Sequence, residues 1–206
     1  MSVLDARRAR PLEGGASFSL RNRILRVLWG ATWLLFCRFT PPLLHPWRAL
    51  VLKVFGAKLG KGARVHGSVK VWLPANLEFG DNVLIGPGVR LYNQGNITIG
   101  SRSVISQRAH ICASTHDIAD PDFQLVLRPV SIGVQCWVAA EAFVGPGVTM
   151  ADRSILAARG VLFGDTAADG VYSGNPAVLI KQRQLRANSG RGPSTSTAPQ
   201  PQQNRP

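Results

Sequence analysis

The sequence contains few cysteines, and their positions show no pattern. Cys37, Cys112 and Cys136 have neither paired spacing nor a cluster of histidines and cysteines beside them. The sequence therefore gives no support to a disulfide framework or to a zinc site. We expect no bound metal, and a protein that works in a reducing compartment such as the cytoplasm.

Long apolar runs are also absent. The first residues, "MSVLDARRARPLEGGASFS", are charged and lack the apolar core of a cleavable signal peptide. The most apolar stretch, "ILRVLWGATWLLFC" at residues 24–37, contains Arg26 and is shorter than the ~20 residues that a membrane span needs. We therefore predict neither a signal peptide nor a transmembrane helix, and we interpret residues 24–37 as an amphipathic or core helix.

Acidic residues are scarce at both ends of the chain, whose formal net charge is +13. Residues 1–70 contain 13 lysines and arginines against 2 acidic residues, and residues 181–206 contain 5 against none. Residues 71–180 are mildly acidic, with 6 basic residues against 9 acidic ones. Because a nucleic-acid-binding fold carries its cations on the folded surface, often beside exposed aromatic residues, we expect no nucleic-acid partner.

Apolar residues recur every six positions through the middle of the chain. A glycine often follows the apolar residue, and the fifth place of each hexad holds a small or modest side chain such as Ala142 or Ser154. This period matches neither a helix nor a hairpin, and it predicts short strands wound into a coil, with three hexads per coil and glycines that give the turns their backbone freedom. The longest run is Ile132, Val138, Val144, Met150, Leu156 and Leu162.

Two interpretations of residues 18–56 stay open. The segment combines tryptophans with arginines and a lysine, which suits peripheral binding to an anionic membrane surface, at the inner face of the cytoplasmic membrane. Alternatively, the segment caps one end of the coil. The residues concerned are Trp29, Trp33, Trp47, Arg21, Arg23, Arg26, Arg38, Arg48 and Lys53.

The sequence resembles the hexapeptide-repeat acyltransferases, and within them most closely the colanic acid biosynthesis acetyltransferases. The maltose, galactoside and nodulation acetyltransferases are more distant. The resemblance runs from about Phe18 to Arg183, and it implies an all-β fold, a left-handed parallel β-helix with an N-terminal helical segment and a projecting loop. It is carried by "FGAKLGKGARVHGSV", "NLEFGDNVLIG", "LYNQGNITIG", "ICASTHDIADPDFQL", "WVAAEAFVGPGVTM" and "YSGNPAVLIKQR".

Composition and resemblance together divide the chain into five parts. The ends carry no apolar period, and the last of them is rich in proline, serine and glutamine. The expected parts are a flexible N-terminus at 1–17, a helical or amphipathic segment at 18–56, a β-helix at 57–180 with a loop at 117–130, a basic segment at 181–187 and a disordered tail at 188–206.

The stretch "STHDIADPDFQLVLRPVSIG" at residues 114–133 interrupts the repeat, and insertions of this kind commonly carry function. The resemblance implies that His116, at its base, is the general base that takes a proton from an acceptor hydroxyl, a task for which imidazole is suited near neutral pH. Asp117 could orient the ring or serve a neighbouring subunit's acceptor site, or it could simply start the loop. His45, His66 and His110 are interpreted as a packing turn and surface positions.

The resemblance also implies a strip for acetyl-CoA along the later coils. The matching positions are Ala140, Ala158, Lys181 and Arg183. Relatives often have a Thr-Lys pair after the last hexads, where this chain has Phe163-Gly164, so Arg159 is a candidate to replace that phosphate contact.

The acceptor pocket departs from the galactoside and maltose enzymes. Their asparagine and aspartate columns hold Gly86 and Gln94 in this chain, which argues against a simple galactoside or maltose as acceptor. Tyr92 and Asn93 are candidate substrate-binding residues, although a Tyr-Asn pair at the end of a strand is also common in turns.

The resemblance implies an O-acetyltransferase that moves acetyl from acetyl-CoA to a sugar hydroxyl in the biosynthesis of an exopolysaccharide similar to colanic acid. It also implies a homotrimer with active sites between subunits, and a sugar or glycan as the acceptor partner. Three alternatives stay open: an amino sugar or serine as acceptor, a non-catalytic trimeric scaffold, and a metal enzyme like the γ-carbonic anhydrases. The histidine spacing does not favour the last of these.

Overall fold

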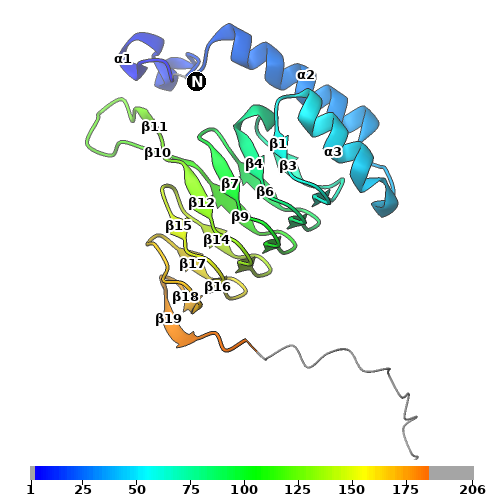
Figure 1. Ribbon diagram of the computed structural model, residues 1–206. Helices are drawn as coiled ribbons and strands as arrows, with labels where there is room; N and C mark the ends of the chain where they lie inside the picture. The colour runs from blue at the N-terminus through cyan, green and yellow to red at the C-terminus, as the bar shows by residue number, and fades with distance from the viewer. Residues whose placement is uncertain (1–2, 186–206) are drawn as a thin grey trace, which may run out of the picture.

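The computed structural model describes residues 3–185. Helices near the N-terminus lie over one end of a tapering parallel β-helix, and the chain leaves the β-helix at its other end (Figure 1). The predicted disordered tail at 188–206 lies outside the described residues.

Three sheets form the faces of the β-helix, and each coil adds one short parallel strand to each face. The first sheet contains β1 (Lys58–Leu59), β4 (Leu77–Phe79), β7 (Ile97–Ile99), β12 (Val130–Ile132) and β15 (Thr149–Met150). The second contains β2 (Arg64–Val65), β5 (Leu84–Ile85), β8 (Val104–Ile105), β13 (Trp137–Val138), β16 (Ile155–Leu156), β18 (Gly170–Gly174) and β19 (Ala177–Gln182). The third contains β3 (Lys70–Val71), β6 (Arg90–Tyr92), β9 (His110–Cys112), β14 (Phe143–Val144) and β17 (Val161–Leu162).

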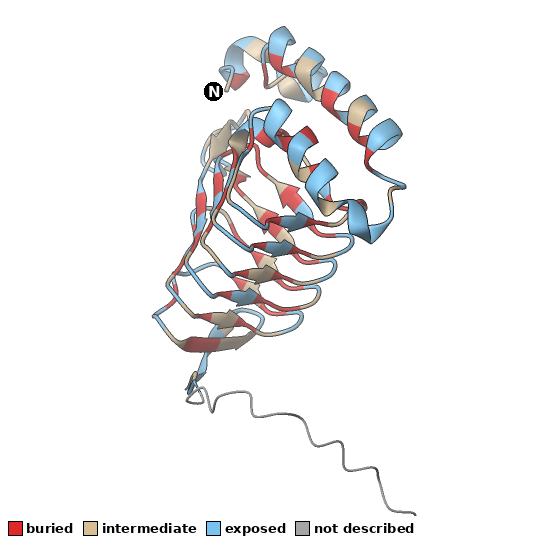
Figure 2. Ribbon diagram, turned by 45° about the vertical axis from the view of Figure 1, so that its right-hand side comes forward, coloured by how far each residue is buried: buried red, intermediate tan, exposed pale blue. Residues whose placement is uncertain are grey.

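The hexad pattern builds the core, as predicted. The apolar residues of the second sheet stack in register and are completely buried; they are Val65, Ile85, Ile105, Val138 and Leu156. Each such side chain contributes roughly 1.5–3 kcal/mol when fully buried. The small residues in the fifth place point inward as well, at Ala63, Val83, Ser103, Cys136 and Ser154. Figure 2 shows buried residues recurring along every coil.

The glycines that follow the apolar residues allow close approach of the backbones, and the prediction that they give the turns their freedom was wrong. Gly80, Gly100 and Gly133 are not in the left-handed region. A Cβ on Gly100 would lie only 2.5 Å from the carbonyl carbon of Gly133 in the next coil. The left-handed residue comes two places later, as at Asn82 (φ 56°) and Arg102 (φ 59°).

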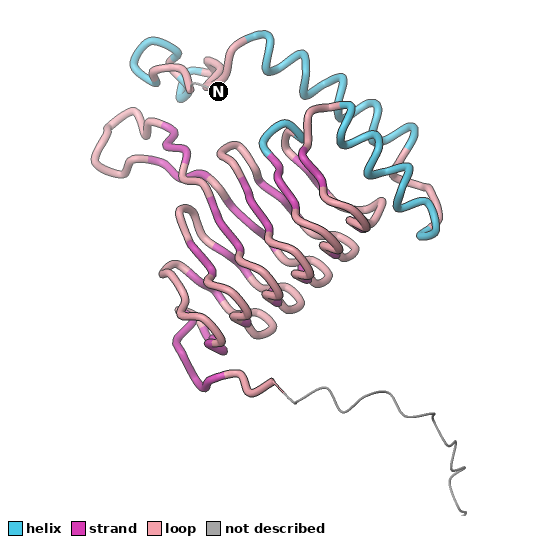
Figure 3. Tube along the Cα trace, viewed as in Figure 1, coloured by secondary structure: helices cyan, strands magenta, loops and turns pink. Residues whose placement is uncertain are grey.

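The insertion that interrupts the repeat is an antiparallel hairpin. Its strands are β10 (Ser114–His116) and β11 (Leu125–Leu127), and they project from the β-helix (Figure 3). Asp117 Oδ1 accepts a hydrogen bond from the backbone N–H of Ala119 at 2.9 Å, and Asp120 makes the same contact with Asp122. These short aspartate turns shape the tip.

The N-terminal part contains three helices, α1 (Ala6–Ala9), α2 (Leu20–Phe36) and α3 (His45–Val54), and short 3₁₀ turns at Pro11–Glu13 and Pro42–Leu44; a third 3₁₀ turn, Pro74–Asn76, follows the first coil. Residues 3–17 were expected to be flexible, but here they lie against the hairpin. Gln124 Nε2 donates to the carbonyl of Leu4 at 3.0 Å, and Gln124 Oε1 accepts from the N–H of Ala6.

Two tryptophans fix α2 over the first coil. Trp29 Nε1 donates to the carbonyl of Val71 at 2.9 Å, and Trp33 Nε1 donates to that of Gly67 at 3.1 Å. Both indoles are buried. The segment therefore covers the open end of the β-helix. Within residues 3–185, no helix is both long and apolar enough to cross a bilayer.

Arg48 joins α3 to the rest of this cap. Its side chain is completely buried, and it donates to the carbonyls of Val65 (2.7 Å), Pro41 (2.9 Å) and Pro42 (3.0 Å) and to the hydroxyl of Thr40 (2.7 Å). A buried guanidinium is tolerated when its N–H groups are satisfied in this way.

Candidate active site

The position of His116 is set by the hairpin. It is the last residue of β10, where it pairs with Leu125, and its side chain is exposed. Nδ1 of the imidazole lies 2.7 Å from the carbonyl oxygen of Phe123. Because a carbonyl oxygen can only accept a hydrogen bond, Nδ1 carries the proton in the neutral ring. Nε2 therefore presents a lone pair, as a general base requires.

Asp117 does not hold the ring. Its carboxylate accepts from Ala119 in the tip of the hairpin, and its backbone N–H donates to the carbonyl of Gln124 at 2.9 Å. The ring is oriented by the carbonyl of Phe123. Sequence reasoning missed Phe123, because only the folded hairpin brings it back to His116.

A cavity of about 470 Å³ lies beside His116. The hairpin, the start of α2 and the first two coils all contribute to its wall. Residues that line it with polar or aromatic groups are Arg23, Arg26, Trp72, Tyr92, Gln94, Ser114 and Thr115. The cavity thus collects side chains from parts of the chain that are more than 90 residues apart in sequence.

Gln94 leaves a hydrogen-bonding atom of this wall unsatisfied. Only 5% of its surface is exposed, and its Nε2 donates to the hydroxyl of Tyr92 at 3.1 Å. Its Oε1 has no hydrogen-bond partner within the described part of the chain and has almost no accessible surface. An orphaned buried oxygen costs about 1–3 kcal/mol, and a ligand hydroxyl could bond it only after the side chain turned toward the cavity. The sequence indicated Gln94 as a site residue only through its position, which matches the position of the sugar-binding aspartate in the galactoside and maltose enzymes.

The structure brings Tyr92 to this cavity but not Asn93. Burial raises the pKa of the Tyr92 phenol, which therefore stays protonated as a hydrogen-bonding group. Asn93 is completely buried, and its Oδ1 accepts from the backbone N–H groups of Trp72 (2.9 Å) and Leu73 (3.3 Å). Its amide thus secures the preceding coil and has no surface for a substrate.

A second hollow, of about 1020 Å³, runs along the later coils. Four of the five residues predicted for acetyl-CoA line it: Ala140, Ala158, Lys181 and Arg183. Arg159 does not line it, because its Nε donates to a carboxylate oxygen of Glu141 at 2.8 Å. That hydrogen bond and charge, together with Arg108, lower the pKa of Glu141. We call this hollow the C-terminal groove.

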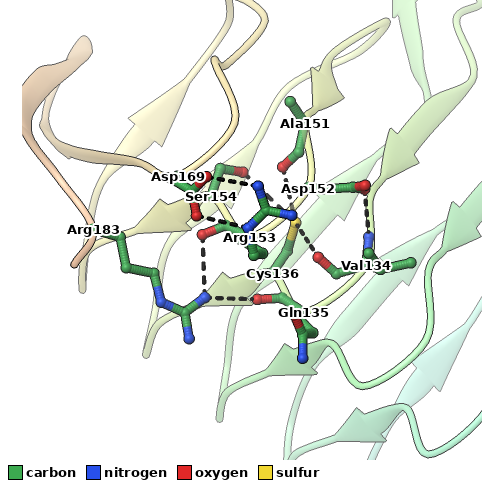
Figure 4. A network of polar contacts seen from close by, with 9 residues as sticks. All are labelled: Val134, Gln135, Cys136, Ala151, Asp152, Arg153, Ser154, Asp169 and Arg183. Carbon is green, nitrogen blue, oxygen red and sulfur yellow. Dashed lines mark hydrogen bonds and ion pairs between the residues drawn. The ribbon is translucent and has the colours of Figure 1, made fainter. Parts of the chain in front are cut away.

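Arg183 forms one wall of the C-terminal groove and is held by the backbone. Its Nη1 donates to the carbonyls of Gln135 (3.0 Å) and Arg153 (3.2 Å), as Figure 4 shows. Arg153 in turn forms a two-pronged pair with Asp169, both contacts 2.7 Å long. This pair lowers the pKa of Asp169, and it ties the coil to the segment before β18. Nearby Cys136 is buried, and burial raises the pKa of its thiol.

Phe163 and Gly164, which stand where relatives often have a Thr-Lys pair, lie at the surface of the last coil. Phe163 is 63% exposed, and its ring lies 5.7 Å from that of Phe143. It supplies no charge to the C-terminal groove, and the two residues do not line it.

The other three histidines occupy separate places. His45 Nδ1 lies 3.1 Å from the carbonyl of Val65, and His66 bonds Ser68 at 2.9 Å. His110 lies between Tyr92 and Phe143 and makes an edge-to-face contact with each ring. Burial lowers the pKa of both His66 and His110. Among residues 3–185, no three His, Cys, Asp or Glu side chains gather as metal ligands would.

Comparison with known proteins identifies a relative in sequence and two similar solved structures. The chain is 42% identical to the "Putative colanic acid biosynthesis acetyltransferase WcaF" of Escherichia coli K12, over 79% of this chain and 89% of that protein. No family model matches the chain.

Two solved structures match most of the chain with low identity. One is a maltose O-acetyltransferase from Clostridium difficile 630, 22% identical, with a TM-score of 0.74 over 81% of this chain and 90% of that one. The other is a galactoside acetyltransferase, 19% identical, with a TM-score of 0.74 over 89% of this chain and 92% of that one. These likenesses confirm the predicted left-handed parallel β-helix.

Proposed function

The chain belongs to the hexapeptide-repeat acetyltransferases, together with WcaF, and from this membership we propose that it transfers acetyl from acetyl-CoA to a sugar hydroxyl in the assembly of an exopolysaccharide. One observation carries the proposal. His116 lines a cavity rich in hydrogen-bonding groups, and its Nε2 is free because Nδ1 bonds the carbonyl of Phe123. WcaF is named for colanic acid biosynthesis, and the two structural neighbours are named for sugars.

His116 Nε2 takes the proton of the acceptor hydroxyl while the hydroxyl oxygen attacks the carbonyl carbon of the thioester. The resulting imidazolium keeps its Nδ1–H bonded to the carbonyl of Phe123, which stabilises the positive charge. When the tetrahedral intermediate collapses, the C–S bond breaks and the imidazolium returns its proton to the sulfur. The products are the acetyl ester and CoA, and no acetyl-enzyme forms.

Gln94 and Tyr92 bind the acceptor in this proposal. The Gln94 side chain turns toward the cavity so that its unpartnered, buried Oε1 accepts from a sugar hydroxyl, and the Tyr92 ring offers a face against which a sugar can pack. In a non-catalytic scaffold, nothing would offset the cost of the unsatisfied buried amide of Gln94 beside the exposed imidazole of His116. This contrast favours the enzyme over the scaffold.

Acetyl-CoA binds in the C-terminal groove. Ala140 and Ala158 leave room for the pantetheine arm, and Lys181 and Arg183 supply charge for the phosphates. The galactoside acetyltransferase among the neighbours was solved in complex with coenzyme A. Arg159 is left out of this set because Glu141 occupies its guanidinium.

The complete active site forms between subunits of a homotrimer. Among residues 3–185 of one chain, no residue lines both the His116 cavity and the C-terminal groove. The groove follows the ends of β8, β13 and β16, whereas His116 follows β9 at another corner of the β-helix. A closed threefold ring would bring one subunit's imidazole to the next subunit's groove.

Residues 18–56 also hold the enzyme at an anionic membrane surface. Phe39 and Leu43 are 84% and 88% exposed, and further apolar side chains of α2 and α3 face outward. The sequence contains no acidic residue between Glu13 and Glu78. An exposed apolar face with only positive charge around it suits the interface of anionic lipids.

The transfer is tested by replacing the base. His116→Ala should lower kcat by roughly 10²- to 10⁴-fold, with unchanged melting temperature and oligomeric state. Release of CoA and mass spectrometry of a panel of oligosaccharides and lipid-linked sugars give the readout. His66→Ala serves as the control, since His66 bonds Ser68 away from the cavity. Unchanged turnover in His116→Ala would contradict the assignment.

A further inference from the structure

A third hollow opens directly beside the His116 cavity. It has a volume of about 600 Å³ and lies between α2 and the first coil. Arg23, Arg26 and Trp72 line both hollows, so the two meet at these three side chains. We call the third hollow the cationic groove, because Arg38 and Lys70 also line it and, in the part of the chain that the structure describes, no acidic residue lines either hollow.

The positive charge of the cationic groove is not paired with acidic side chains in the described part of the chain. Within residues 3–185, none of its four cationic side chains takes part in an ion pair. Cations gathered in one groove repel each other. Arg23, Arg38 and Lys70 are exposed and Arg26 is half-buried, so an anionic ligand could reach all four and would reduce their mutual repulsion.

Arg26 is held in place for such a ligand. Its guanidinium carbon lies 3.5 Å from the centre of the Trp72 ring, in a stacked cation–π contact. Stacking occupies the face of the guanidinium and leaves its N–H edge free for forked hydrogen bonds to phosphate oxygens. Arg23 lies three residues earlier on α2, so it emerges from the same side of the helix.

Building on the proposed function, we propose that the acceptor is a sugar diphosphate. The sugar lies in the His116 cavity, and the diphosphate is bound by Arg23 and Arg26 where the two hollows meet. A single carboxylate on a sugar would leave most of the charge unmatched, whereas a diphosphate carries charge enough for several cations. The groove is at the α2 end of the β-helix, opposite β19, so this anion site is distinct from the C-terminal groove (Figure 1).

The group on the far side of the diphosphate would extend along the cationic groove. Its lining includes the exposed side chains of Val27 and Leu34, which suit a prenyl chain, and the half-buried ring of Trp72, which also suits a nucleoside base. Both kinds of sugar diphosphate share the chemistry that Arg23 and Arg26 would recognise. The experiment therefore includes both.

Calorimetric titration with inorganic pyrophosphate, in saturating CoA so that the C-terminal groove is filled, tests the anion site without any sugar. We compare the wild type, the double variant Arg23→Gln/Arg26→Gln, and the control Arg21→Gln/Lys53→Gln, which removes the same charge from exposed positions that line neither hollow. Pyrophosphate should bind the wild type and the control equally and the double variant at least tenfold more weakly. Equal binding to all three, or none to the wild type, would overturn the proposal.

Titration with uridine diphosphate and farnesyl diphosphate then identifies the source, since the correct tail raises affinity above that of pyrophosphate. In the acetyl-transfer assay, kcat/KM for the matching sugar diphosphate should exceed that for the free sugar at least tenfold, and the double variant should lose this preference. Transfer to the sugar diphosphate with unchanged kcat/KM in the double variant, or with a kcat/KM no higher than that for the free sugar in the wild type, would overturn the proposal but leave the proposed function standing. Absence of transfer to every sugar would instead defeat the proposed function.

Discussion

A backbone carbonyl sets the tautomer of His116. The ring could present either nitrogen to a substrate, and the 2.7 Å contact of Nδ1 with Phe123 leaves Nε2 as the nitrogen that acts as base in the proposed function. Phe123 follows the tip of the hairpin, just before β11. The length and the turns of the tip therefore determine where the carbonyl of Phe123 lies relative to the His116 ring. The side chains of Asp117 and Asp120 contribute by shaping those turns.

Gln94 gives the sharpest prediction about the acceptor. Replacing it by leucine keeps most of the volume but removes the unpartnered Oε1 and the hydrogen bond to Tyr92. The loss of a single hydrogen bond of about 1 kcal/mol corresponds to a roughly fivefold rise in KM for the acceptor. KM for acetyl-CoA should not change, because Gln94 does not line the C-terminal groove. Initial-rate kinetics with each substrate varied separately would show the difference, and equal rises in both constants would contradict it.

Single residues also show what sequence alone could and could not reveal. The repeat break pointed to His116, and the motif resemblance pointed to four residues that do line one groove. Asn93 and Gln94 are neighbours in sequence, and only the fold shows that one satisfies buried backbone groups while the other lines the cavity. Phe123, Arg23 and Arg26 come to the site through tertiary contacts that no local pattern encodes.

At the scale of structural elements, the stacking of the coils depends on glycines whose backbones approach the next coil too closely to leave room for a side chain. Gly100→Ala would place a Cβ 2.5 Å from the carbonyl carbon of Gly133, against backbone that cannot move aside cheaply. We expect a loss of about 1–3 kcal/mol in the free energy of unfolding. Gly164→Ala is the matched control, since nothing lies within 4 Å of its added Cβ and its φ is not left-handed. Chemical denaturation measures both, and equal stability of the two variants would refute the close-approach argument.

The period of six predicted these coils well, because burial imposes it directly on the sequence. The role of the glycines could not be predicted in the same way. A glycine selected for close approach looks identical in sequence to one selected for a left-handed φ, and here Asn82 and Arg102 take the left-handed places. The hairpin and the pairing of residues 4–6 with Gln124 are likewise set by tertiary contacts.

The helical cap carries the membrane prediction. Phe39→Asp/Leu43→Asp would put two negative charges at the most exposed apolar positions of the cap. The wild type should float with liposomes that contain phosphatidylglycerol, and the variant should remain in the dense fraction. Arg90→Asp/Arg102→Asp, at exposed positions of the coils, is the control. It tests whether added negative charge away from the cap also prevents flotation with the liposomes. Flotation of the Phe39/Leu43 variant at the wild-type level would rule out this surface.

The whole molecule has its helical cap at one end of the β-helix and β19 at the other (Figure 1). In the proposed function the acceptor and acetyl-CoA are separated within a chain, because the His116 cavity and the C-terminal groove lie at different corners of the β-helix. The account therefore needs a neighbouring subunit to bring the two together.

Complementation between two inactive variants tests this central claim most directly. His116→Ala lacks the base, and Ala140→Trp fills the C-terminal groove. Each variant alone should be inactive. When they are co-expressed with different tags and purified as mixed trimers, about a quarter of the sites formed by random mixing should contain both intact halves, and acetyl transfer should reappear. Mixed trimers that assemble and remain inactive would contradict a site shared between subunits.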